Sequence, residues 1–364
     1  MPRRIAVDAM GGDDAPAVVA EGAVRALQST DDGGATDGGG ESGDGEEALE
    51  VLLFGPEERV QAALDEVLAE GGAELRGAEL PIRVAHAPDV IGMGEAPATA
   101  VKQKQQSSIH RGIGACKEGE ADAFASAGNT GAIMAASLFT MGCLPEVDRP
   151  SVMGIVPTLE GRCLLMDVGT NVDCRPAHLV QFARMGTVYV RRVWDRPEPT
   201  VGLLNVGEEP GKGNEQARAA YDLLAGQPDL DFTGNVEGRD MLAHAADVVV
   251  CDGFIGNITL KFGESIATTL LSEMVRREIE RQGLSRQEAA AVKGVLEGVQ
   301  EPFDYEARGG FPLLGVQGSV LVGHGSSSAR AIERMIGAAA EVAGLHVPQA
   351  IAAAFEEVPV AGAS

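Results

Sequence analysis

The chain repeats one order of segments: a short apolar run, a polar loop that contains glycine, and a stretch with the apolar spacing of a helix. Residues 4–10, 121–126, 163–169 and 246–253 are such runs, and each leads through a loop into a helical stretch. The runs are continuous rather than alternating in polarity, which is typical of strands covered on both faces. Strands alternating with helices predict an α/β fold with a mainly parallel sheet and right-handed crossovers.

Two segments depart from this order. Residues 262–308 contain no strand pattern and predict two helices broken near Gly283, which we interpret as a helical hairpin that projects from the body. Residues 31–47 contain only Gly, Asp, Glu, Ser, Thr and Ala, so they cannot bury apolar surface and predict a surface loop. The strand pattern resumes at Gly318, and we predict that residues 1–364 form a single α/β unit.

The composition favours a cytoplasmic protein with a core of Ala, Val, Leu and Ile. Apolar residues make up 45% of the chain and aromatic residues only 4%. No apolar run approaches the roughly 18 to 20 residues that span a bilayer. The first twelve residues lead directly into a strand and a glycine turn, without the longer apolar region of a secretory signal.

Charge and cysteine content exclude several classes of function. The formal charge of -25, from 54 acidic and 29 basic residues, argues against nucleic-acid binding, because a phosphate backbone requires a basic footprint. The five cysteines form no CxxC pair, which argues against a disulfide framework and a zinc site. Cys251 ends a strand run and precedes Asp252, so it is either a nucleophile or a buried structural thiol.

Small and polar residues gather where the predicted strands end. Ligands of open parallel sheets bind beyond the carboxyl ends of the strands, so we expect these residues to meet at one edge. They suit an anion or a carbonyl substrate, because glycines let backbone N–H groups approach and helix N-termini favour negative charge. The alternative is that they only cap helices and turn loops. The candidates are Asp8, Gly11, Gly12, Asp13, Ser126, Gly128, Asn129, Thr130, Gly131, Asp167, Asn171, Asn205, Lys212, Asn214, Asn235, Glu237, Asp252, Asn257, His324, Ser326 and Ser327.

The sequence SAGNTG at residues 126–131 predicts an anion cradle at the head of a helix, but the known phosphate and catalytic motifs do not fit this chain. The stretch GEEPGKGN resembles a P-loop, yet it has three residues before its Gly-Lys, and Gly213 replaces the Ser or Thr that would hold magnesium. No GxGxxG follows a strand, no GxSxG occurs, and the six histidines lack metal spacing. We therefore expect chemistry without a cofactor or a metal.

Taken together, the motifs resemble one family, the bacterial phosphate acyltransferases. They follow the family's order from residue 5 to about residue 337. The resemblance implies transfer of a fatty acyl group from an acyl carrier protein thioester to inorganic phosphate. The matching stretches are IAVDAMGGD, SAGNTGA, DRPS, LLMDVGTNVD, HLVQFARMG, GLLNVGEE, KGNE, GNVEGRD, ADVVVCDGFIGN, LLGV and GHGSS.

The resemblance also implies a three-layer α/β/α fold similar to phosphotransacetylases and isocitrate-type dehydrogenases, a homodimer, and a role in glycerophospholipid synthesis. The acyl phosphate would pass to a glycerol-3-phosphate acyltransferase. Two features differ from the family pattern: Asp14 stands where the family usually has histidine, and residues 31–47 look like an insertion. We expect a capping or supporting role for the residue at position 14, and a surface loop accommodates an insertion at small cost.

The reaction needs no nucleophile from the protein, because phosphate itself attacks the thioester carbonyl. The site must hold phosphate and stabilise the oxyanion. We predict that Asn129, Thr130 and nearby N–H groups hold phosphate, with Gly11, Gly12, Asp13, Ser126, Gly128, Gly131, Asn171, Asn214, Asn257 and Ser326 as further binding residues. Lys212, His324 and Asn235 are the candidate catalytic residues, where Lys212 supplies positive charge and His324 contacts phosphate or protonates the departing thiolate. Asp8, Asp167 and Asp252 are expected to orient loops, because a carboxylate facing phosphate would repel it.

The predicted hairpin offers a contact for an acidic carrier protein at Arg276, Arg277 and Arg281, although an ordinary solvated face would look the same. The resemblance implies a peripheral membrane contact for the hairpin. Its stretch AAAVKGVLEGVQEPF carries one lysine against two glutamates, so we expect only weak attraction to anionic lipid at the inner face of the membrane. Two rival functions stay open: a coenzyme A-dependent phosphotransacylase or dehydrogenase on the same fold, and a non-catalytic scaffold that binds carrier protein.

Overall fold

The computed structural model describes residues 2–31, 48–71 and 80–357. The predicted surface loop at 31–47 lies, apart from its first residue, outside the described residues. Eleven strands form one sheet in the order β3-β2-β1-β4-β11-β10-β5-β6-β9-β7-β8. The strands are β1 (Arg3–Asp8), β2 (Leu49–Gly55), β3 (Ile82–His86), β4 (Ala123–Ser126), β5 (Ser151–Thr158), β6 (Gly161–Met166), β7 (Thr200–Asn205), β8 (Asp231–Glu237), β9 (Val248–Val250), β10 (Phe311–Leu314) and β11 (Ser319–Val322).

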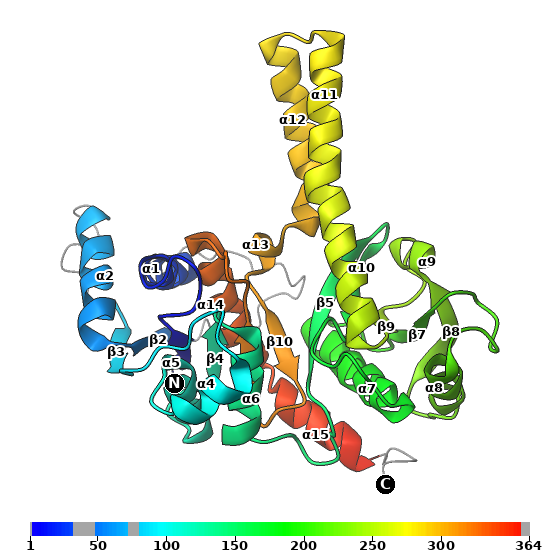
Figure 1. Ribbon diagram of the computed structural model, residues 1–364, viewed down its shortest axis with the longest axis horizontal. Helices are drawn as coiled ribbons and strands as arrows, with labels where there is room; N and C mark the ends of the chain where they lie inside the picture. The colour runs from blue at the N-terminus through cyan, green and yellow to red at the C-terminus, as the bar shows by residue number, and fades with distance from the viewer. Residues whose placement is uncertain (1, 32–47, 72–79, 358–364) are drawn as a thin grey trace.

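Helices cover both faces of this sheet, which confirms the expected α/β fold (Figure 1). One layer contains α1 (Ala17–Asp31), α2 (Glu57–Glu70), α7 (Pro176–Val193), α8 (Glu215–Ala225), α14 (Ala329–Gly344) and α15 (Val347–Glu357). The other layer contains α4 (Pro97–Gln103), α5 (Ser108–Lys117), α6 (Thr130–Thr140), α9 (Gly238–Leu242) and α10 (Gly253–Ser265).

The continuous apolar runs predicted as strands are buried on both faces. In β1, Ile5 and Val7 pack into the layer that contains α1 and α14, while Ala6 between them packs against α5. Successive strand residues point to opposite faces of the sheet. In a strand between two helix layers both sets of side chains are therefore buried, and every position favours an apolar residue. Small residues also bring neighbouring helices of one layer close: a Cβ on Gly22 of α1 would lie 2.5 Å from the Cβ of Ile332 in α14.

The sheet reverses direction in its middle. The five strands β3, β2, β1, β4 and β11 are parallel to one another, and so are β6, β9, β7 and β8. The pairs β11–β10, β10–β5 and β5–β6 are all antiparallel, so three reversals separate the two groups. The carboxyl ends of the two groups therefore face opposite edges of the sheet.

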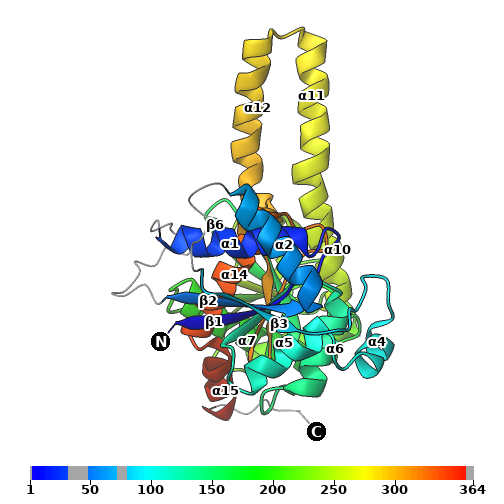
Figure 2. The ribbon, with the colours of Figure 1, turned by 90° about the vertical axis from the view of Figure 1, so that its left-hand side faces the viewer.

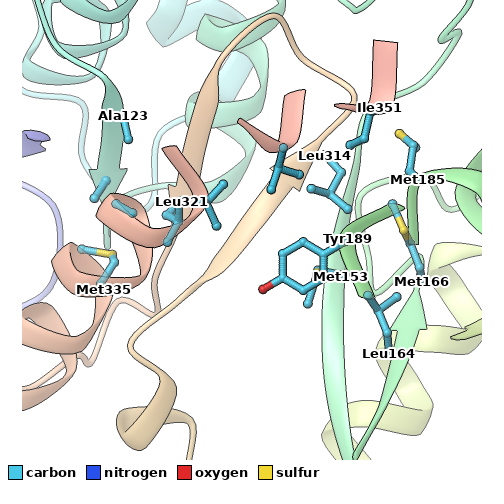
Figure 3. Packing of buried hydrophobic residues seen from close by; sticks show 14 of the residues in the cluster. Ala123, Met153, Leu164, Met166, Met185, Tyr189, Leu314, Leu321, Met335 and Ile351 are labelled. Atoms are coloured by element: carbon cyan, nitrogen blue, oxygen red, sulfur yellow. The ribbon is translucent and has the colours of Figure 1, made fainter. Parts of the chain in front are cut away.

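Apolar side chains from both halves meet along this reversal. Met153 of β5 and Leu164 and Met166 of β6 pack near Leu314 of β10 and Tyr189 of α7 (Figure 3). Few of these side chains are aromatic, as the composition indicates. The core is continuous from β1 to β7, so the reversal divides the direction of the strands and not the hydrophobic core.

A long helical pair projects from the body (Figures 1 and 2). Helix α10 continues through a π-helical turn, η1 (Ile266–Leu270), into α11 (Leu271–Gln282), and the chain returns through α12 (Arg286–Gln300), the 3-10 turn η2 (Glu301–Phe303) and α13 (Tyr305–Arg308). Gly283 ends α11 with φ of 63°, in the left-handed region that glycine adopts readily. Ser285 and Glu288 then form a capping box that starts α12.

Among the described residues, no single helix is both long and apolar enough to cross a membrane. Helices α14 and α15 reach the required length and composition only as a pair, bent by 43°. Both helices bury apolar residues in the core, including Ile336 and Ile351.

Candidate active site

The predicted site residues do not meet at one edge of the sheet. Because the sheet reverses, the loops after β1, β4 and β11 lie at one edge, and we call residues 8–13, 126–131 and 323–328 the first loop cluster. The loops after β6, β7, β8 and β9 lie at the other edge, and residues 167–171, 205–214, 235–237 and 252–257 form the second loop cluster. The expectation of a single edge is wrong, because it assumed one strand direction throughout.

Asp8 organises the base of the first loop cluster. Its carboxylate accepts hydrogen bonds from the Ser126 hydroxyl at 2.6 Å and from the Met10 amide at 3.1 Å. Burial raises the pKa of Asp8, and hydrogen bonds from Ser108, Ser126 and Met10 act against that rise. Gly11 passes so close that a Cβ there would lie 2.7 Å from both Asp8 Oδ2 and the Gly128 nitrogen. The glycine therefore lets the first two loops touch.

Asn129 caps α6 and anchors a neighbouring loop with the same side chain. Its Oδ1 accepts a hydrogen bond from the Ala132 amide at 3.1 Å. Its Nδ2 donates to the carbonyl oxygens of Gly92, Met93 and Glu95, at 3.3, 3.0 and 3.0 Å. The side-chain amide is thus engaged inside the protein, so any donor available at the head of α6 belongs to the backbone.

The backbone at the head of α6 contains N–H groups that have no hydrogen-bond acceptor among the described residues. Within the described part of the chain, the N–H groups of Asn129, Thr130 and Gly131 make no hydrogen bond. They stand at the N-terminus of a helix, where the macrodipole also favours an anion. The predicted anion cradle therefore has the donors it requires, supplied by backbone amides.

The loop after β11 closes the first loop cluster. Gly325 accepts a hydrogen bond from the Asp13 amide at 2.8 Å, so the β11 and β1 loops are in contact. The Nδ1 atom of His324 lies 2.8 Å from the Ser326 hydroxyl, and the Ser326 amide donates to the same Nδ1 at 3.3 Å. A nitrogen that accepts from an amide carries no proton, so the neutral imidazole of His324 holds its proton on Nε2.

Asp167 shapes the second loop cluster. Its oxygens accept hydrogen bonds from the amides of Gly169, Thr170 and Asn171 at 2.9, 2.8 and 2.8 Å, and from Asn171 Nδ2 at 2.6 Å. Burial raises the pKa of Asp167, while the Thr170 amide and the other donors lower it. A carboxylate enclosed by its own loop holds that loop in shape.

The start of α10 packs directly on this loop. Asp252 caps the helix by accepting from the Ile255 amide at 2.9 Å. A Cβ on Gly253 would lie 2.7 Å from the Asn171 oxygen, and one on Gly256 only 1.9 Å from the Asp167 oxygen. The motif DGFIGN therefore has glycines where the helix touches the loop, and Asn257 lies beside Gly169.

Lys212 and Asn235 belong to the far end of the second loop cluster. Asn205 Nδ2 donates to Asn235 Oδ1 at 3.0 Å, and Asn235 Nδ2 donates to the Glu209 oxygen at 2.8 Å. Lys212 is exposed, and its Nζ lies 3.8 Å from Glu209 Oε2. Strands β7 and β4 are six spacings apart, roughly 29 Å, so the structure does not bring Lys212 to the head of α6. Asn214 caps α8 and accepts from the Ala217 amide at 2.8 Å.

Burial raises the pKa of all five cysteine thiols, which favours their protonated form. Cys251 is buried and donates to the Asp167 oxygen at 3.7 Å, and burial raises its pKa well above the ordinary value. Burial also raises the pKa of Cys174 to about 12. Cys251 therefore fits the structural alternative and not the nucleophile. No group of three or more His, Cys, Asp or Glu side chains among the described residues is placed to hold a metal ion.

The three arginines of the hairpin are paired within their own helix. Arg276 contacts Glu273 and Glu280, Arg277 contacts Glu273, and Arg281 contacts Glu278. All three are exposed, and the helix α11 carries three arginines against three glutamates. The outer part of the hairpin therefore has no strong basic patch.

Two parts of the first loop cluster and its surroundings were missed by sequence reasoning. The loop that Asn129 holds, residues 92–95, was not singled out, although its glycines in IGMGEAP marked a turn beside a helix start. Lys104 supports that loop by donating to the Val90 oxygen at 2.7 Å and to Glu95 Oε1 at 2.6 Å. No local signal in the sequence pairs Lys104 with this site, because the pairing arises from the fold.

Comparison with known proteins places this arrangement in a family. Residues 3–350 match the family model described as "Fatty acid synthesis protein". The phosphate acyltransferase of Salinibacter ruber (strain DSM 13855 / M31) is 54% identical over 353 residues, which cover 97% of this chain and 98% of that protein. The phosphate acyltransferase of Chlorobaculum parvum (strain DSM 263 / NCIMB 8327) is 48% identical over 357 residues, with 96% and 98% covered.

Solved structures show the same fold at low sequence identity. A phosphotransacetylase from Streptococcus pyogenes has a TM-score of 0.58 at 19% identity and covers 95% of this chain and 94% of its own. The EutD phosphotransacetylase from Staphylococcus aureus has a TM-score of 0.56 at 14% identity, with 94% of each chain covered. These likenesses confirm the expected fold, and the high identities over nearly the full length show that the chain belongs to the phosphate acyltransferase family and is an acyltransferase.

Proposed function

We propose that this chain transfers a fatty acyl group from the thioester of acyl carrier protein to inorganic phosphate, releasing acyl phosphate and the carrier thiol. The observation that carries the proposal is the head of α6, where three consecutive backbone N–H groups at residues 129–131 lack acceptors among the described residues. Gly11 and Gly128 let the loops after β1 and β4 pack against each other and against Asp8 at the base of this cluster. The names of the relatives and the description of the family model support acyl transfer to phosphate in fatty acid synthesis.

Phosphate bound by these amides is the nucleophile. Its oxygen forms the new bond to the thioester carbonyl carbon, and a tetrahedral oxyanion results. Collapse of the oxyanion breaks the carbon–sulfur bond, and the proton that leaves phosphate passes to the thiolate. The protein's part is to hold phosphate in line with the carbonyl and to donate hydrogen bonds to the oxyanion.

His324 is the proposed donor in this step. Its Nδ1 accepts from the Ser326 amide, so the neutral ring has its N–H at Nε2. That N–H suits a hydrogen bond to the oxyanion or proton delivery to the thiolate. Ser326 orients the ring and belongs with the proposed substrate-binding residues.

The second loop cluster has a separate proposed role. Lys212 and Asn235 lie at the edge of the sheet opposite to the head of α6, so they do not share one phosphate ion with Asn129 in a single chain. We propose that Lys212 and Asn235 act on a different part of the substrate, while Asp167 and Asp252 keep their loops in place. Substitution at Lys212 tests whether this edge takes part in catalysis.

A homodimer is part of the proposal. Apolar side chains recur every four residues along α10, η1 and α11, and all are exposed: Phe254, Ile258, Phe262, Ile266, Leu270 and Met274. Such a stripe supports an interface with a second copy. Sedimentation of the wild type as a monomer would contradict it.

The remaining partners follow from the proposed product and carrier. We propose that a glycerol-3-phosphate acyltransferase consumes the acyl phosphate, and that the protein works in the cytoplasm with weak peripheral contact at the inner face of the membrane. Acidic carrier protein would contact Arg276, Arg277 and Arg281, where its carboxylates exchange with Glu273, Glu278 and Glu280. Substituting the three arginines with alanine should then raise the KM for the carrier thioester and leave its kcat unchanged.

The direct test uses purified protein, long-chain acyl carrier protein and phosphate, with product trapped by hydroxylamine. Phosphate-dependent hydroxamate is expected, with kcat reduced about a hundredfold in His324→Gln. A parallel Lys212→Ala variant reports on the second loop cluster, since a comparable loss there would place chemistry at that edge. Activity on acyl-coenzyme A alone would favour the phosphotransacylase alternative, and carrier binding without turnover would favour the scaffold.

A further inference from the structure

A small cavity lies where the two halves of the molecule meet at the base of the hairpin. It has a volume of about 100 Å³ and is lined by residues of β5, β6, α7, α13, β10 and α14. Helix α14 packs on β1, β4 and β11, whereas α7 packs on β6, β7 and β9. The cavity therefore borders both strand groups and is separate from the head of α6.

Its lining is positively charged. Arg162, Arg308 and Arg334 contribute three guanidinium groups and Glu341 one carboxyl, which gives a net charge of 3 − 1 = +2 with Glu341 ionised. The whole chain carries -25. Three arginines therefore surround one cavity in a protein whose overall charge is strongly negative, which makes this cavity a local site of positive potential.

Two of the arginines have no carboxylate partner. Within the described residues, no ion pair shorter than 4 Å involves Arg162 or Arg334. The guanidinium carbon of Arg162 instead stacks over the Trp194 ring at 4.5 Å from the centroid. Stacking holds the guanidinium plane in place and leaves its N–H edge for another acceptor.

The residues that line the cavity are held in place by contacts between segments that are distant in the sequence. Arg308 donates to the Ile155 oxygen at 2.8 Å and to the Pro302 oxygen at 2.7 Å, so it ties β5 to the end of the hairpin. A Cβ on Gly309 would lie 2.1 Å from the Met335 nitrogen, which shows how closely this turn packs on α14. The Tyr189 and Trp194 rings meet edge to face, and the Tyr189 hydroxyl points away from Met166 and Met185 (Figure 3).

Among the residues that line the cavity, Glu341 carries the charge that opposes the binding of an anion. Its carboxyl makes no hydrogen bond or ion pair within the described residues. Burial raises the pKa of Glu341, and the nearby charge of Arg162 lowers it. The carboxyl therefore reduces the positive potential of the cavity without being satisfied itself.

We propose that this cavity is a second anion site, which binds a phosphate group through Arg162 and Arg334 at the junction of the two halves. A volume of about 100 Å³ has room for a small tetrahedral oxyanion. Planar guanidinium groups match phosphate oxygens in pairs. Because residues of α14 and β6 would grip the same ion, its binding ties the two halves together. The site is separate from the proposed catalytic phosphate site, so it does not depend on that assignment.

Isothermal titration of the full-length protein with inorganic phosphate tests the proposal. An Arg162→Gln/Arg334→Gln double variant is expected to lose one equivalent of bound phosphate per chain relative to wild type. An Arg192→Gln variant, which removes an exposed arginine of α7, is the matched control and is expected to behave as wild type. Methyl phosphate in place of inorganic phosphate shows whether the site accepts a phosphomonoester.

A second variant keeps the test decisive if the double variant fails to fold. Glu341→Gln removes the opposing charge with little change in shape, so phosphate binding at this site should tighten about threefold or more. Equal stoichiometry in wild type and a folded double variant would overturn the proposal. Unchanged affinity in Glu341→Gln would overturn it independently, since the charge of Glu341 would then not reach the bound anion.

Discussion

At the residue scale, the Asn129 side chain has a structural role that bears on the proposed phosphate site. Asn129 was expected either to bind phosphate or merely to cap a helix, and its side chain caps α6 and holds the 92–95 loop. Its backbone N–H, with those of Thr130 and Gly131, stays available for an anion. The capping role therefore creates the proposed binding role, because a fixed helix start aims the amides.

Replacing Asn129 should affect both stability and phosphate affinity. Asn129→Ala loses the cap and three loop anchors, so we expect a loss of about 1–2 kcal/mol in the free energy of unfolding. The KM for phosphate should rise, because the amides at the head of α6 are no longer held. Denaturant unfolding and steady-state kinetics measure the two effects.

Ser285→Ala provides the matched control at the tip of the hairpin. Ser285 caps α12 through the Glu288 amide and is remote from both loop clusters. It should lose about 1 kcal/mol of stability through the cap alone, with the KM for phosphate unchanged. An equal rise of KM in both variants would show that the effect at Asn129 is only a loss of stability.

The thiols allow a prediction about pH. Burial raises the pKa of both Cys163 and Cys174 to about 12. These thiols stay protonated at pH 8, with a thiolate fraction about a thousandfold below that of an ordinary cysteine. Activity between pH 7 and 10 should therefore show no thiol titration, and Cys174→Ser should remain active. A pH profile that changes in this range in wild type and not in Cys174→Ser would contradict the assignment.

At the scale of elements, the contact of α10 with the loop after β6 decides how the second loop cluster is built. The helix approaches so closely that Gly253 and Gly256 touch the backbone of the loop that Asp167 holds. The other face of the same helix is exposed, and it continues into the hairpin. A shift of α10 would therefore move both the site and the hairpin.

Gly256→Ala tests this contact against Gly263→Ala in the same helix. A Cβ at 256 would lie 1.9 Å from the Asp167 oxygen, so we expect a loss of about 3 kcal/mol or more in the free energy of unfolding. A Cβ at 263 meets nothing within 4 Å, and the higher helix propensity of alanine should add up to about 1 kcal/mol. Urea unfolding of the two variants compares them, and equal stability would contradict the close packing.

At the scale of the whole molecule, a buried ion pair helps to dock the C-terminal helix. The guanidinium of Arg184 in α7 binds both carboxylate oxygens of Asp229, at 2.7 and 3.1 Å, and the Gln227 oxygen at 2.9 Å. It also lies 5.4 Å from the Phe355 ring of α15. The side chain of Arg184 is almost fully buried, so its charge depends on Asp229.

Asp229→Ala should destabilise the protein by about 3–5 kcal/mol, because it removes the carboxylate that binds a buried guanidinium through both oxygens. Glu21→Ala is the control: it breaks the exposed pair between Glu21 and Arg25, whose cost should stay below about 0.5 kcal/mol. Denaturant midpoints of the two variants measure the difference. Similar losses in both would mean that Arg184 reaches solvent or another partner after the substitution.

Local pattern was sufficient for the elements and for the chemical nature of their loops. The continuous apolar runs became buried strands, and Gly283 ends α11 where the hairpin sequence predicts a break. The cradle at residues 126–131 was recognisable because glycine, a cap residue and a helix start follow one another in the chain. Such features depend on neighbours within a few residues, which the sequence displays directly.

Three features of the molecule are determined only by its tertiary structure. The pairing of β10 with β5 and β11 reverses the sheet, and this separates Lys212 from Asn129 although both follow strands. The side chain of Asn129 forms hydrogen bonds to the 92–95 loop. Arginines from β6, α13 and α14 line one cavity. Strand direction and long-range contacts depend on how apolar surfaces from distant segments pack together. The sequence alone therefore determined the kind of elements, their loops and the family, while only the fold decided which loops share an edge.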